Sequence, residues 1–425
     1  MKAYSQMNST ELREERQRVQ ASFAELQKLG LHLDMSRGKP GKQQLDLVTD
    51  LLQYPTADAF CMDGFDARNY GSLYGLPSAR KLFAELLGVQ PEEVLVGGNA
   101  SLSLMYGVIS KAYTHGLLHS PRPWCKEQSL KFLCPAPGYD RHFKITQSFG
   151  MELIAIPMTA EGPDMDLVEE LVQDPAVKGM WCVPKYSNPQ GIIYSEHTID
   201  RIAHLHPAAP DFTLMWDNAY CIHEFDTDFA PFRDILTLCR EAGNPDMVFE
   251  FASTSKITFP GAGVACMAAS VDSLRYIAEL MSVEIISFDK VNQLRHVCYL
   301  QDKAHTLALM KKHAAILAPK FHAVLDTLEQ EIAPLDIAHW DRPVGGYFVS
   351  FDAMPGTAKR VLALCAQAGV VMTPAGATFP YGKDPQDSNI RIAPSLPPVQ
   401  ELEQAMQVFC TCVKLAALEK LTEAC

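Results

Sequence analysis

The sequence predicts an α/β protein with a mainly parallel sheet of seven strands and a second, smaller α+β domain. Short apolar runs alternate with amphipathic stretches of helical period from residue 94 to residue 269, and this alternation is typical of a parallel sheet with right-handed crossovers. The 425 residues also exceed the length at which one hydrophobic core stops growing, so we expect two domains. The expected strands cover residues 94–96, 130–134, 152–157, 179–183, 213–216, 248–251 and 265–269.

The segment before the sheet predicts two helices with a loop between them. The first helix begins at one of the polar residues 8–10 and continues to about Leu29, because small polar side chains cap helix N-termini and Gly30 ends the pattern. Residues 36–41, Ser-Arg-Gly-Lys-Pro-Gly, form a loop, since glycine and proline interrupt regular structure. A second helix covers about residues 44–53.

Helices fill most intervals between the strands, and the second domain follows them. A long helical stretch over about residues 290–332 leads out of the sheet domain. We place the large domain at residues 52–295 and build the small domain from residues 1–51, folded back, and residues 296–425. Further helices are expected from Pro77 and at residues 100–115, 165–173, 195–205, 357–368 and 398–421, and small-domain strands at residues 345–351 and 389–393.

Composition and charge disfavour several classes of protein. Lys plus Arg number 37 against 50 Asp plus Glu, giving a formal net charge of -13, which argues against a nucleic-acid partner because phosphate binding needs clustered cations. Residues 1–5 lack the apolar core of a signal peptide, and no apolar run reaches the ~18 residues of a membrane span. The 12 cysteines lack the spacing of a zinc site. We expect a cytoplasmic protein with reduced thiols, no metal and no membrane contact.

Lys256 lies where a reactive amine is expected. It follows the apolar strand at residues 248–251 in the sequence Ser-Thr-Ser-Lys and precedes the glycine-rich residues 260–263. A lysine among small hydroxyl residues at a strand end can lose solvent, which lowers the pKa of its amine toward the free base that attacks aldehydes. A solvated loop lysine is the plain alternative for any single lysine.

Other polar residues follow neighbouring strands. The sequence Gly-Gly-Asn-Ala-Ser at residues 97–101 lies before a helix, where free N–H groups favour an anion, although taken alone it is better explained by a tight turn with an Asn cap. Asn188, Asp217 and Tyr139 also follow strands, at the edge where open α/β sheets bind ligands; an Asn-Pro turn and a helix N-cap are alternatives for the first two. A buried carboxylate needs a partner. Arg391 could fork onto a carboxylate or lie on the surface.

Taken together, these motifs resemble the fold-type I pyridoxal-phosphate aminotransferases of class I/II. The resemblance covers about residues 30–410 and is nearest to the aspartate aminotransferase type Ic subgroup, which carries the loop at residues 36–41 and the Asn-Gln-Leu-Arg-His stretch at residues 292–296. It implies the aspartate aminotransferase-like fold. The residues that carry it are, in order, Tyr70, Asn99-Ala100-Ser101, Tyr139, Asn188-Pro189-Gln190-Gly191, Asp217-Asn218-Ala219-Tyr220, Ser253-Thr254-Ser255-Lys256 and Arg391-Ile392-Ala393-Pro394.

The resemblance implies a role for each side chain near the reacting atoms. Lys256 would hold the aldehyde of pyridoxal 5'-phosphate as a Schiff base and then move the proton between the substrate Cα and the cofactor. Asp217 would keep the pyridine nitrogen protonated, so that the ring can accept electrons. Asn188 and Tyr220 would donate hydrogen bonds to the phenolate oxygen, and Tyr139 would stack on the ring.

The resemblance also implies contacts to the phosphate and the substrate. The residues expected around the phosphate are Asn99, Ala100 and Ser101 at a helix N-terminus, Ser253, and Tyr70 from a neighbouring subunit. Arg391 would grip the substrate α-carboxylate beside Asn188, and Gly38 would let the backbone approach the substrate closely. Because each site would borrow Tyr70 from the other subunit, the resemblance implies a homodimer with shared active sites.

One position departs from the family pattern. The family usually has an arginine eight residues after the lysine to bind phosphate, whereas this chain has Val264. Lys290 and Arg295 are candidates to replace that charge. A dicarboxylate substrate would also need a second cation for its side chain, for which Arg37, Arg141, Lys290 and Arg295 are the candidates.

The function that the resemblance implies is aspartate:2-oxoglutarate transamination in ping-pong half-reactions on amino-acid and 2-oxo-acid substrates. An aminotransferase for another amino acid and a pyridoxal-phosphate-dependent β-lyase are alternatives, since Lys256 and Arg391 would serve both. A non-catalytic cofactor-binding domain of a transcription regulator is disfavoured, because only about 30 residues precede the shared region and the net charge is -13. A nicotinamide dehydrogenase is disfavoured because no Gly-x-Gly-x-x-Gly follows the first strand.

Overall fold

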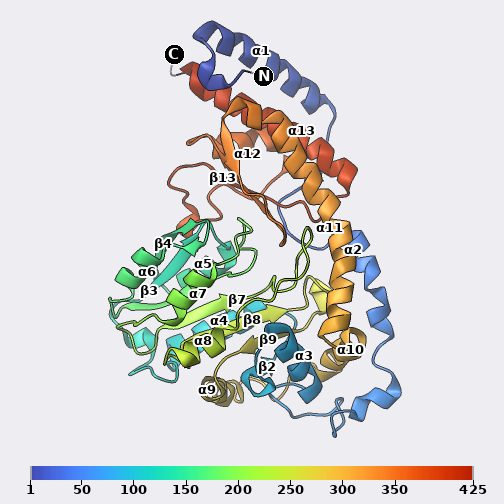
Figure 1. Ribbon diagram of the computed structural model, residues 1–425, viewed down its shortest axis with the longest axis vertical. Helices are drawn as coiled ribbons and strands as arrows, with labels where there is room; N and C mark the ends of the chain where they lie inside the picture. The colour runs from blue at the N-terminus through green and yellow to red at the C-terminus, as the bar shows by residue number, and fades with distance from the viewer. Residues whose placement is uncertain (1, 424–425) are drawn as a thin grey trace.

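A large mixed sheet forms the centre of the lower part of the molecule, and a smaller sheet lies above it (Figure 1). The computed structural model describes residues 2–423. The strands of the large sheet are β2 (Val94–Val96), β3 (Lys131–Ala136), β4 (Glu152–Thr159), β5 (Gly162–Pro163), β6 (Val177–Cys182), β7 (Thr213–Asp217), β8 (Val248–Ser253) and β9 (Ala265–Ala268). Their order is β2-β9-β8-β7-β6-β3-β4-β5, with antiparallel pairing only at β2/β9, β9/β8 and β4/β5 within residues 2–423.

The seven predicted strands are present, with small shifts at their ends. Every residue of β6, β7 and β9 is buried, which is why these strands are mostly apolar rather than alternating. The eighth strand, β5, was not predicted, because Gly162 and Pro163 are too short a run to show a period. The pairing confirms the expected mainly parallel α/β sheet.

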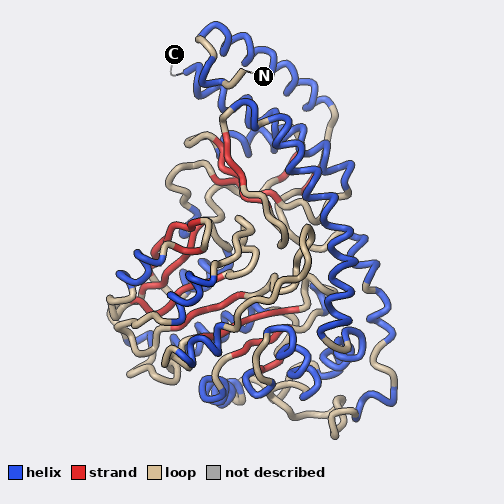
Figure 2. The backbone as a smooth tube through the Cα atoms, in the orientation of Figure 1, coloured by secondary structure: helices blue, strands red, loops and turns tan. Residues whose placement is uncertain are grey.

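Helices cover both faces of the large sheet (Figure 2). They are α3 (Pro77–Leu87), α4 (Ser101–Thr114), α5 (Asp140–Ser148), α6 (Met165–Leu171), α7 (Glu196–Ala203), α8 (Ile235–Glu241), α9 (Val271–Met281) and α10 (Lys290–Leu300). Leu214 and Trp216 of β7 join a core with α3, α6, α7, α8 and α10, while Met215 between them joins a core with α4, α5 and α9. Because both faces are closed, the strand ends are where this sheet can meet a ligand.

The smaller part is built on an antiparallel sheet of β10, β11 and β13. Its elements are α1 (Ser9–Lys28), β1 (Leu33–Asp34), β10 (Ala338–Trp340), β11 (Val349–Ala353), α12 (Ala358–Gln367), β12 (Val370–Val371), β13 (Asn389–Ile392) and α13 (Val399–Glu423). The N-terminal segment joins this part twice: α1 packs along α13 near both chain ends (Figure 1), and β1 pairs in parallel with β12. The domain boundaries at residues 51/52 and 295/296 stay a prediction.

The long helix predicted over residues 290–332 is interrupted. It consists of α10 and α11 (Lys303–Glu331), and α11 runs from the large sheet up to the smaller part (Figure 1). The break has a local cause, because Gln301 adopts a φ of 59° and the side chain of Asp302 caps α11 by accepting from the His305 N–H at 2.8 Å.

Two further predicted elements are shorter than expected. The helix predicted at residues 44–53 is α2 (Lys42–Leu47) followed by a 3-10 turn. The strand predicted at residues 345–351 begins only with β11, since Gly345 lies against Tyr186, where a Cβ would come within 2.4 Å of the ring. The 3-10 turns are η1 (Tyr4–Gln6), η2 (Thr49–Gln53), η3 (Ala57–Cys61), η4 (Pro91–Glu93), η5 (Trp124–Lys126), η6 (Pro260–Ala262), η7 (Ala333–Leu335) and η8 (Pro380–Gly382).

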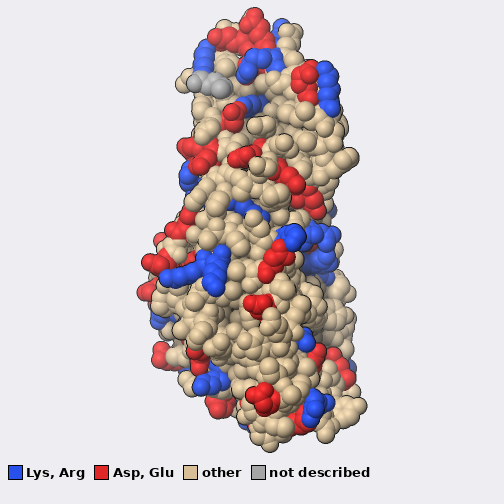
Figure 3. Space-filling view, turned by 90° about the vertical axis from the view of Figure 1, so that its right-hand side faces the viewer, with Lys and Arg blue, Asp and Glu red and all other residues tan. Residues whose placement is uncertain are grey.

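Charged side chains of both signs are interspersed over the side of the molecule that Figure 3 turns toward the viewer. Between residues 2 and 423, no helix combines the length and the apolar character that a membrane crossing requires. The same stretch contains no group of three or more His, Cys, Asp or Glu side chains arranged to hold a metal ion.

Candidate active site

A cavity of ≈ 900 Å³ opens between the carboxyl ends of the parallel strands and the smaller sheet. Asp217 ends β7 and Lys256 follows β8, so both enter the cavity from the large sheet, whereas Arg391 of β13 enters from the smaller one. The predicted residues that line this cavity are Gly38, Ser101, Tyr139, Asn188, Asp217, Tyr220, Lys256 and Arg391. The fold therefore brings residues from both ends of the chain into one cavity.

Lys256 points its amine at two aromatic rings. Its Nζ lies 4.8 Å from the ring centre of Tyr220 and 5.8 Å from that of Tyr347. Burial lowers the pKa of the Lys256 amine, and the Asp217 carboxylate acts in the opposite direction. A lysine in this environment releases its proton more readily than a solvated one, which is the property that a nucleophilic or proton-moving amine needs.

Asp217 has one oxygen that is held and one that is not. Its Oδ2 accepts from Nε2 of His142 at 2.9 Å, and the His142 ring stacks on Trp181 with centroids 4.4 Å apart. Its Oδ1 is buried and has no hydrogen-bond partner among residues 2–423. Because leaving a buried carboxylate oxygen unpaired costs stability, this oxygen is available for a group that enters the cavity.

Two phenols flank this centre. Burial raises the pKa of Tyr220 well above its usual range, and burial followed by the charge of Asp217 raises the pKa of Tyr139 to about 12. Both hydroxyls therefore stay protonated near neutral pH and can donate hydrogen bonds. The ring of Tyr139 packs edge-on against His142, with centroids 4.9 Å apart.

Arg391 is buried, so the alternative of a surface arginine is wrong. Its Nη1 donates to Asn188 Oδ1 at 3.2 Å, and its Nη2 donates to Thr373 Oγ1 at 3.5 Å. Its guanidinium lies 4.7 Å from the ring centre of Phe348. Nε has no partner within the described part of the chain, and the only carboxylate near Nη1 there is that of Asp140, at 3.6 Å. This arginine can therefore still bind a carboxylate from solution.

Gly38 shapes the cavity through an aromatic ring. A Cβ at this position would lie 2.4 Å from the ring of Phe348, a distance that no real side chain can keep. Glycine is thus required for Phe348 to occupy the place where it supports the Arg391 guanidinium. The predicted close approach of the Gly38 backbone to a substrate stays a prediction.

The predicted phosphate residues lie around the start of α4. Its N-cap residue, Ala100, offers no side-chain hydrogen bond to the first helical N–H groups, and Ser101 turns into the cavity. Asn99 is exposed, and its carbonyl accepts from Ser255 Oγ at 3.5 Å. Ser253 Oγ accepts from the Ser255 N–H at 3.4 Å. The start of a helix with uncapped N–H groups favours an anion.

Tyr70 does not join the cavity of its own chain. Its side chain is 80% exposed, and its backbone N–H donates to Asn69 Oδ1 at 2.9 Å. The loop that carries it is anchored through the next residue, because the Gly71 carbonyl accepts from Lys290 Nζ at 2.8 Å. An aromatic side chain held this far out is available to a neighbouring molecule.

The family arginine expected eight residues after the lysine is absent from this chain. Val264 is 2% exposed and packs in the hydrophobic core, so a side chain at this position does not face the cavity. A Cβ on Gly263 would instead come within 3.2 Å of Thr254 Oγ1 and 3.5 Å of the Ser255 nitrogen. Gly263 is therefore the position that faces the loop before the lysine, and it carries no charge.

The four candidate cations fall into two groups. Lys290 and Arg295 bind backbone carbonyls away from the cavity, Lys290 at 2.8 Å and Arg295 at 3.0 Å. Arg37 and Arg141 are exposed and line the cavity. Of the four candidates, Arg37 and Arg141 are therefore the two that line the cavity, and a role toward a second carboxylate stays a prediction.

Sequence reasoning missed three side chains that shape the site. His142 is the partner that the buried Asp217 needs, and Tyr347 and Phe348 supply the rings beside Lys256 and Arg391. The need for a partner was predictable, but its identity was not, because His142 and Asp217 lie 75 residues apart. The sequence Gly-Gly-Tyr-Phe before β11 was the available signal for the two rings, since glycines often mark a close approach.

Fold and cavity together define an α/β aminotransferase, in which a lysine on the large sheet faces an arginine on the smaller one. Residues 7–424 match the family described as aspartate amino-transferase, and the chain belongs to this family. An aspartate aminotransferase from Corynebacterium glutamicum is 48% identical over 402 residues, which cover 94% of this chain and 93% of that protein. A putative aminotransferase from Mycolicibacterium smegmatis is 49% identical over 95% of each chain.

Solved structures agree with this assignment. The crystal structure of an aspartate transaminase from Corynebacterium glutamicum superposes with a TM-score of 0.96 at 46% identity and covers 97% of this chain and 98% of that one. The α-aminoadipate aminotransferase of Thermus thermophilus, complexed with N-(5'-phosphopyridoxyl)-L-leucine, shares the fold with a TM-score of 0.75 at 22% identity, over 96% and 98% of the two chains. The protein is thus an aminotransferase that acts on amino-acid and oxo-acid substrates.

Proposed function

We propose that this aminotransferase binds pyridoxal 5'-phosphate and transfers the amino group of aspartate to 2-oxoglutarate in two half-reactions. The observation that carries the proposal is the unpaired Oδ1 of Asp217, buried among described residues that offer it no donor. A protonated pyridine nitrogen would satisfy it, because that group donates one hydrogen bond. The amine of Lys256 and the uncapped start of α4 suit the aldehyde and the phosphate of the same cofactor.

When bound, pyridoxal phosphate supplies the electron sink that stabilises negative charge at the substrate Cα. Asp217, oriented by His142, would hold the proton at the pyridine nitrogen and so keep the ring electron-poor. Lys256 would take the proton from Cα and return it, a role that the lowering of its amine pKa by burial favours. Tyr220 and Asn188, which line the cavity, would donate hydrogen bonds to the ring oxygen, and Tyr139 would lie against the ring face.

Substrate choice would depend on two cationic regions. Arg391 binds the α-carboxylate through its fork, with Asn188 beside it. Arg37 and Arg141 bind the side-chain carboxylate of a dicarboxylic substrate. Aspartate and 2-oxoglutarate both carry two carboxylates, so one pair of regions serves both half-reactions in the same cavity. The aspartate specificity named for the 48% identical relative supports this choice.

The exposed Tyr70 supports a homodimer in which each subunit completes the phosphate site of the other. Its 80% exposed ring lies outside the cavity of its own chain, yet its loop is held firmly by Lys290. Crosslinking and light scattering of wild-type and Tyr70→Phe protein test this. A monomeric wild-type protein that still binds the cofactor tightly would contradict the shared site.

The function is tested by absorption spectra and product analysis. Full-length protein with added pyridoxal phosphate should absorb near the visible range, aspartate should bleach that band, and oxaloacetate should appear in step with glutamate. Lys256→Ala should lower turnover by about 10³-fold or more, whereas Lys42→Ala, which changes an exposed lysine, should not. Release of ammonia instead of glutamate would indicate a β-lyase, and wild-type turnover in Lys256→Ala would overturn the proposal.

A further inference from the structure

Gln44 connects the loop over the cavity with the backbone at Lys256. The side chain of Gln44 is fully buried in α2. Its Oε1 accepts from the Gly41 N–H at 3.3 Å, at the end of the loop of residues 36–41. Its Nε2 donates to the Tyr347 hydroxyl at 2.9 Å and to Nδ1 of His313 at 3.2 Å. Both amide hydrogens of Gln44 are therefore used, one in each of two branches.

Both branches end on the main chain at the lysine. The Tyr347 hydroxyl donates to the Lys256 carbonyl in a long hydrogen bond of 3.5 Å, and His313 Nε2 donates to the Ile257 carbonyl at 3.0 Å. Because a carbonyl can only accept, Nε2 of His313 carries the proton and Nδ1 is left to accept from Gln44. Burial lowers the pKa of His313 to about 4, so the ring stays neutral and the directions agree along both branches.

The other end of the same loop is tied to the substrate arginine. Thr373 Oγ1 donates to the Ser36 carbonyl at 2.8 Å and accepts from Arg391 Nη2 at 3.5 Å. Ser395 Oγ donates to the Lys39 carbonyl at 3.0 Å. The loop of residues 36–41 is thus bonded to the surroundings of Arg391 on one side and, through Gln44, to the backbone of the lysine on the other.

We propose that Gln44 is a positioning residue whose relay through Tyr347 and His313 sets the main-chain position of Lys256 relative to the loop of residues 36–41. The relay keeps the amine between the rings of Tyr220 and Tyr347. This inference rests on the proposed function of Lys256 as the reacting amine. Without the relay, the amine gains solvent and is protonated more fully at neutral pH.

The reactivity of the Lys256 amine measures this directly and needs no cofactor. Full-length protein, freed of bound pyridoxal phosphate with hydroxylamine, is treated with formaldehyde and cyanoborohydride over a range of pH, and methylation of the Lys256 peptide is followed by mass spectrometry with the exposed lysines as internal references. Gln44→Met should raise the pH midpoint of Lys256 methylation by about one unit, which lowers its rate at neutral pH about tenfold. Tyr347→Phe and His313→Leu should each give about a threefold loss, because each cuts one branch.

The relay also predicts that these effects do not multiply. Adding Tyr347→Phe to Gln44→Met should change the rate by less than about twofold, since both act through the same hydrogen bonds. Multiplying effects, or a Gln44→Met rate within about twofold of wild type, would overturn the proposal. If Gln44→Met does not fold, Tyr347→Phe decides alone, and an unchanged midpoint in that variant overturns it. Absence of transamination in wild-type protein would contradict the proposed function and leave this result intact.

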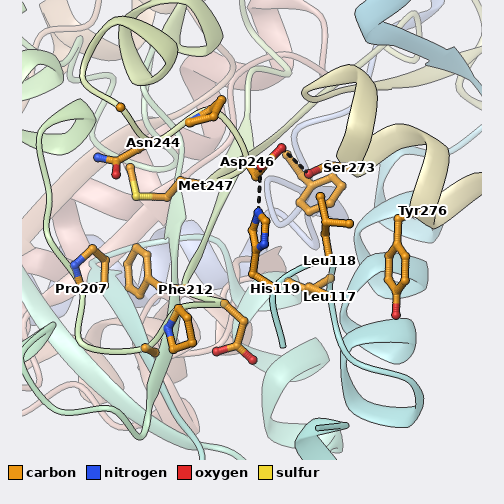
Figure 4. Close-up of a pocket in the computed structure, with 16 residues that line it drawn as sticks. Leu117, Leu118, His119, Pro207, Phe212, Asn244, Asp246, Met247, Ser273 and Tyr276 are labelled. Carbon is orange, nitrogen blue, oxygen red and sulfur yellow. Dashed lines mark hydrogen bonds and ion pairs between the residues drawn. The ribbon is translucent and has the colours of Figure 1, made fainter. Parts of the chain in front are cut away.

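Asn244 provides a matched control in another part of the large sheet. Its Nδ2 also donates to two backbone carbonyls, those of Ala203 and Leu205, each at 2.9 Å. It lines a separate cavity of ≈ 250 Å³ near the amino ends of β7 and β8, where Figure 4 places it beside Met247. Asn244→Leu should lower the melting temperature, as Gln44→Met should, and leave the methylation of Lys256 unchanged.

Discussion

The two ends of the large sheet each carry a cavity with a buried carboxylate, and the two carboxylates differ in their hydrogen bonding. At the amino end, Asp211 is 3% exposed, and both of its oxygens are paired. Oδ1 accepts from Lys178 Nζ at 2.8 Å, and Oδ2 accepts from Trp124 Nε1 at 2.7 Å and from Ser120 Oγ at 2.6 Å. Nearby, Asp246 accepts from His119 and Ser273, as Figure 4 shows.

At the carboxyl end, Asp217 is buried to a similar degree, but its Oδ1 lacks any partner among residues 2–423. The same holds for Nε of Arg391 across the cavity. An unpaired buried polar group costs stability, whereas a fully paired one does not. We infer that Asp211 stabilises the fold, whereas Asp217 and Arg391 each keep a free hydrogen-bonding atom that a ligand can use. One isosteric substitution at each end tests this.

The largest expected effect is that of Asp217→Asn on activity. An amide at this position cannot hold a proton on the pyridine nitrogen, so kcat/KM for aspartate should fall by about 10³-fold. The free energy of unfolding should change by less than about 1 kcal/mol, because Oδ1 of Asp217 makes no hydrogen bond that the substitution could remove. Steady-state kinetics and urea denaturation measure the two. Kinetics within tenfold of wild type would contradict the role of Asp217.

The same substitution at the amino end should affect stability instead. Asp211→Asn leaves the buried ammonium of Lys178 without its counter-charge, so the free energy of unfolding should fall by about 3 kcal/mol. The kcat of the folded protein should not change, because this cavity carries none of the site residues. Urea denaturation followed by kinetics below the transition checks both. A loss of kcat without a loss of stability would reverse the comparison between the two ends.

A smaller effect is expected from the cations that line the carboxyl-end cavity. Arg37→Ala and Arg141→Ala should each raise KM for aspartate about tenfold, equivalent to about 1.4 kcal/mol of binding. The KM for alanine, which has no side-chain carboxylate, should stay the same. Lys42→Ala in α2 serves as the control, because its side chain is 85% exposed and pairs with Asp46. Equal increases in KM for aspartate and alanine would instead mean that the two arginines do not bind the side-chain carboxylate and act only through the electrostatic field of the cavity.

Local patterns predicted the large sheet and the strand-end residues, because period and burial depend on neighbours in sequence. Asp217 and Lys256 were found in this way, each at the end of an apolar run. The partner of Asp217 was not found, since His142 reaches it only after α5 packs on the sheet. Gln44 was missed for the same reason, since Tyr347 lies 303 residues away from it. Hydrogen bonds between distant elements leave no periodic signal in the sequence.

The choice among the four cations needed the structure for a different reason. The same charge is carried by all four side chains, Arg37, Arg141, Lys290 and Arg295. Charge alone does not predict which of them donates a hydrogen bond to a backbone carbonyl. Lys290 and Arg295 donate to backbone carbonyls, while Arg37 and Arg141 line the cavity. The break between α10 and α11 was readable in principle, because Asp302 is a good N-cap residue, but the helical period on either side concealed it.

The smallest effect on activity is expected at Glu250, a buried group with an unpaired oxygen that does not line the carboxyl-end cavity. Glu250 in β8 is 2% exposed, its Oε1 accepts from Asn218 Nδ2 at 2.9 Å, and its Oε2 lacks a partner within the described residues. Burial raises the pKa of Glu250 from 4.5 to about 8, so between these values the folded protein holds a proton that the unfolded chain releases. Stability should therefore fall as pH rises through this window.

Glu250→Gln should remove that pH dependence. At pH 8 the variant should be more stable than wild type, and at pH 5 the two should nearly coincide. Because Glu250 lies outside the carboxyl-end cavity, kcat and KM for aspartate should stay at wild-type values. Urea denaturation at the two pH values gives the stability difference, and parallel kinetics give the rest. A loss of activity in Glu250→Gln would contradict this expectation. It would mean that an unpaired buried group can contribute to the reaction without lining the cavity.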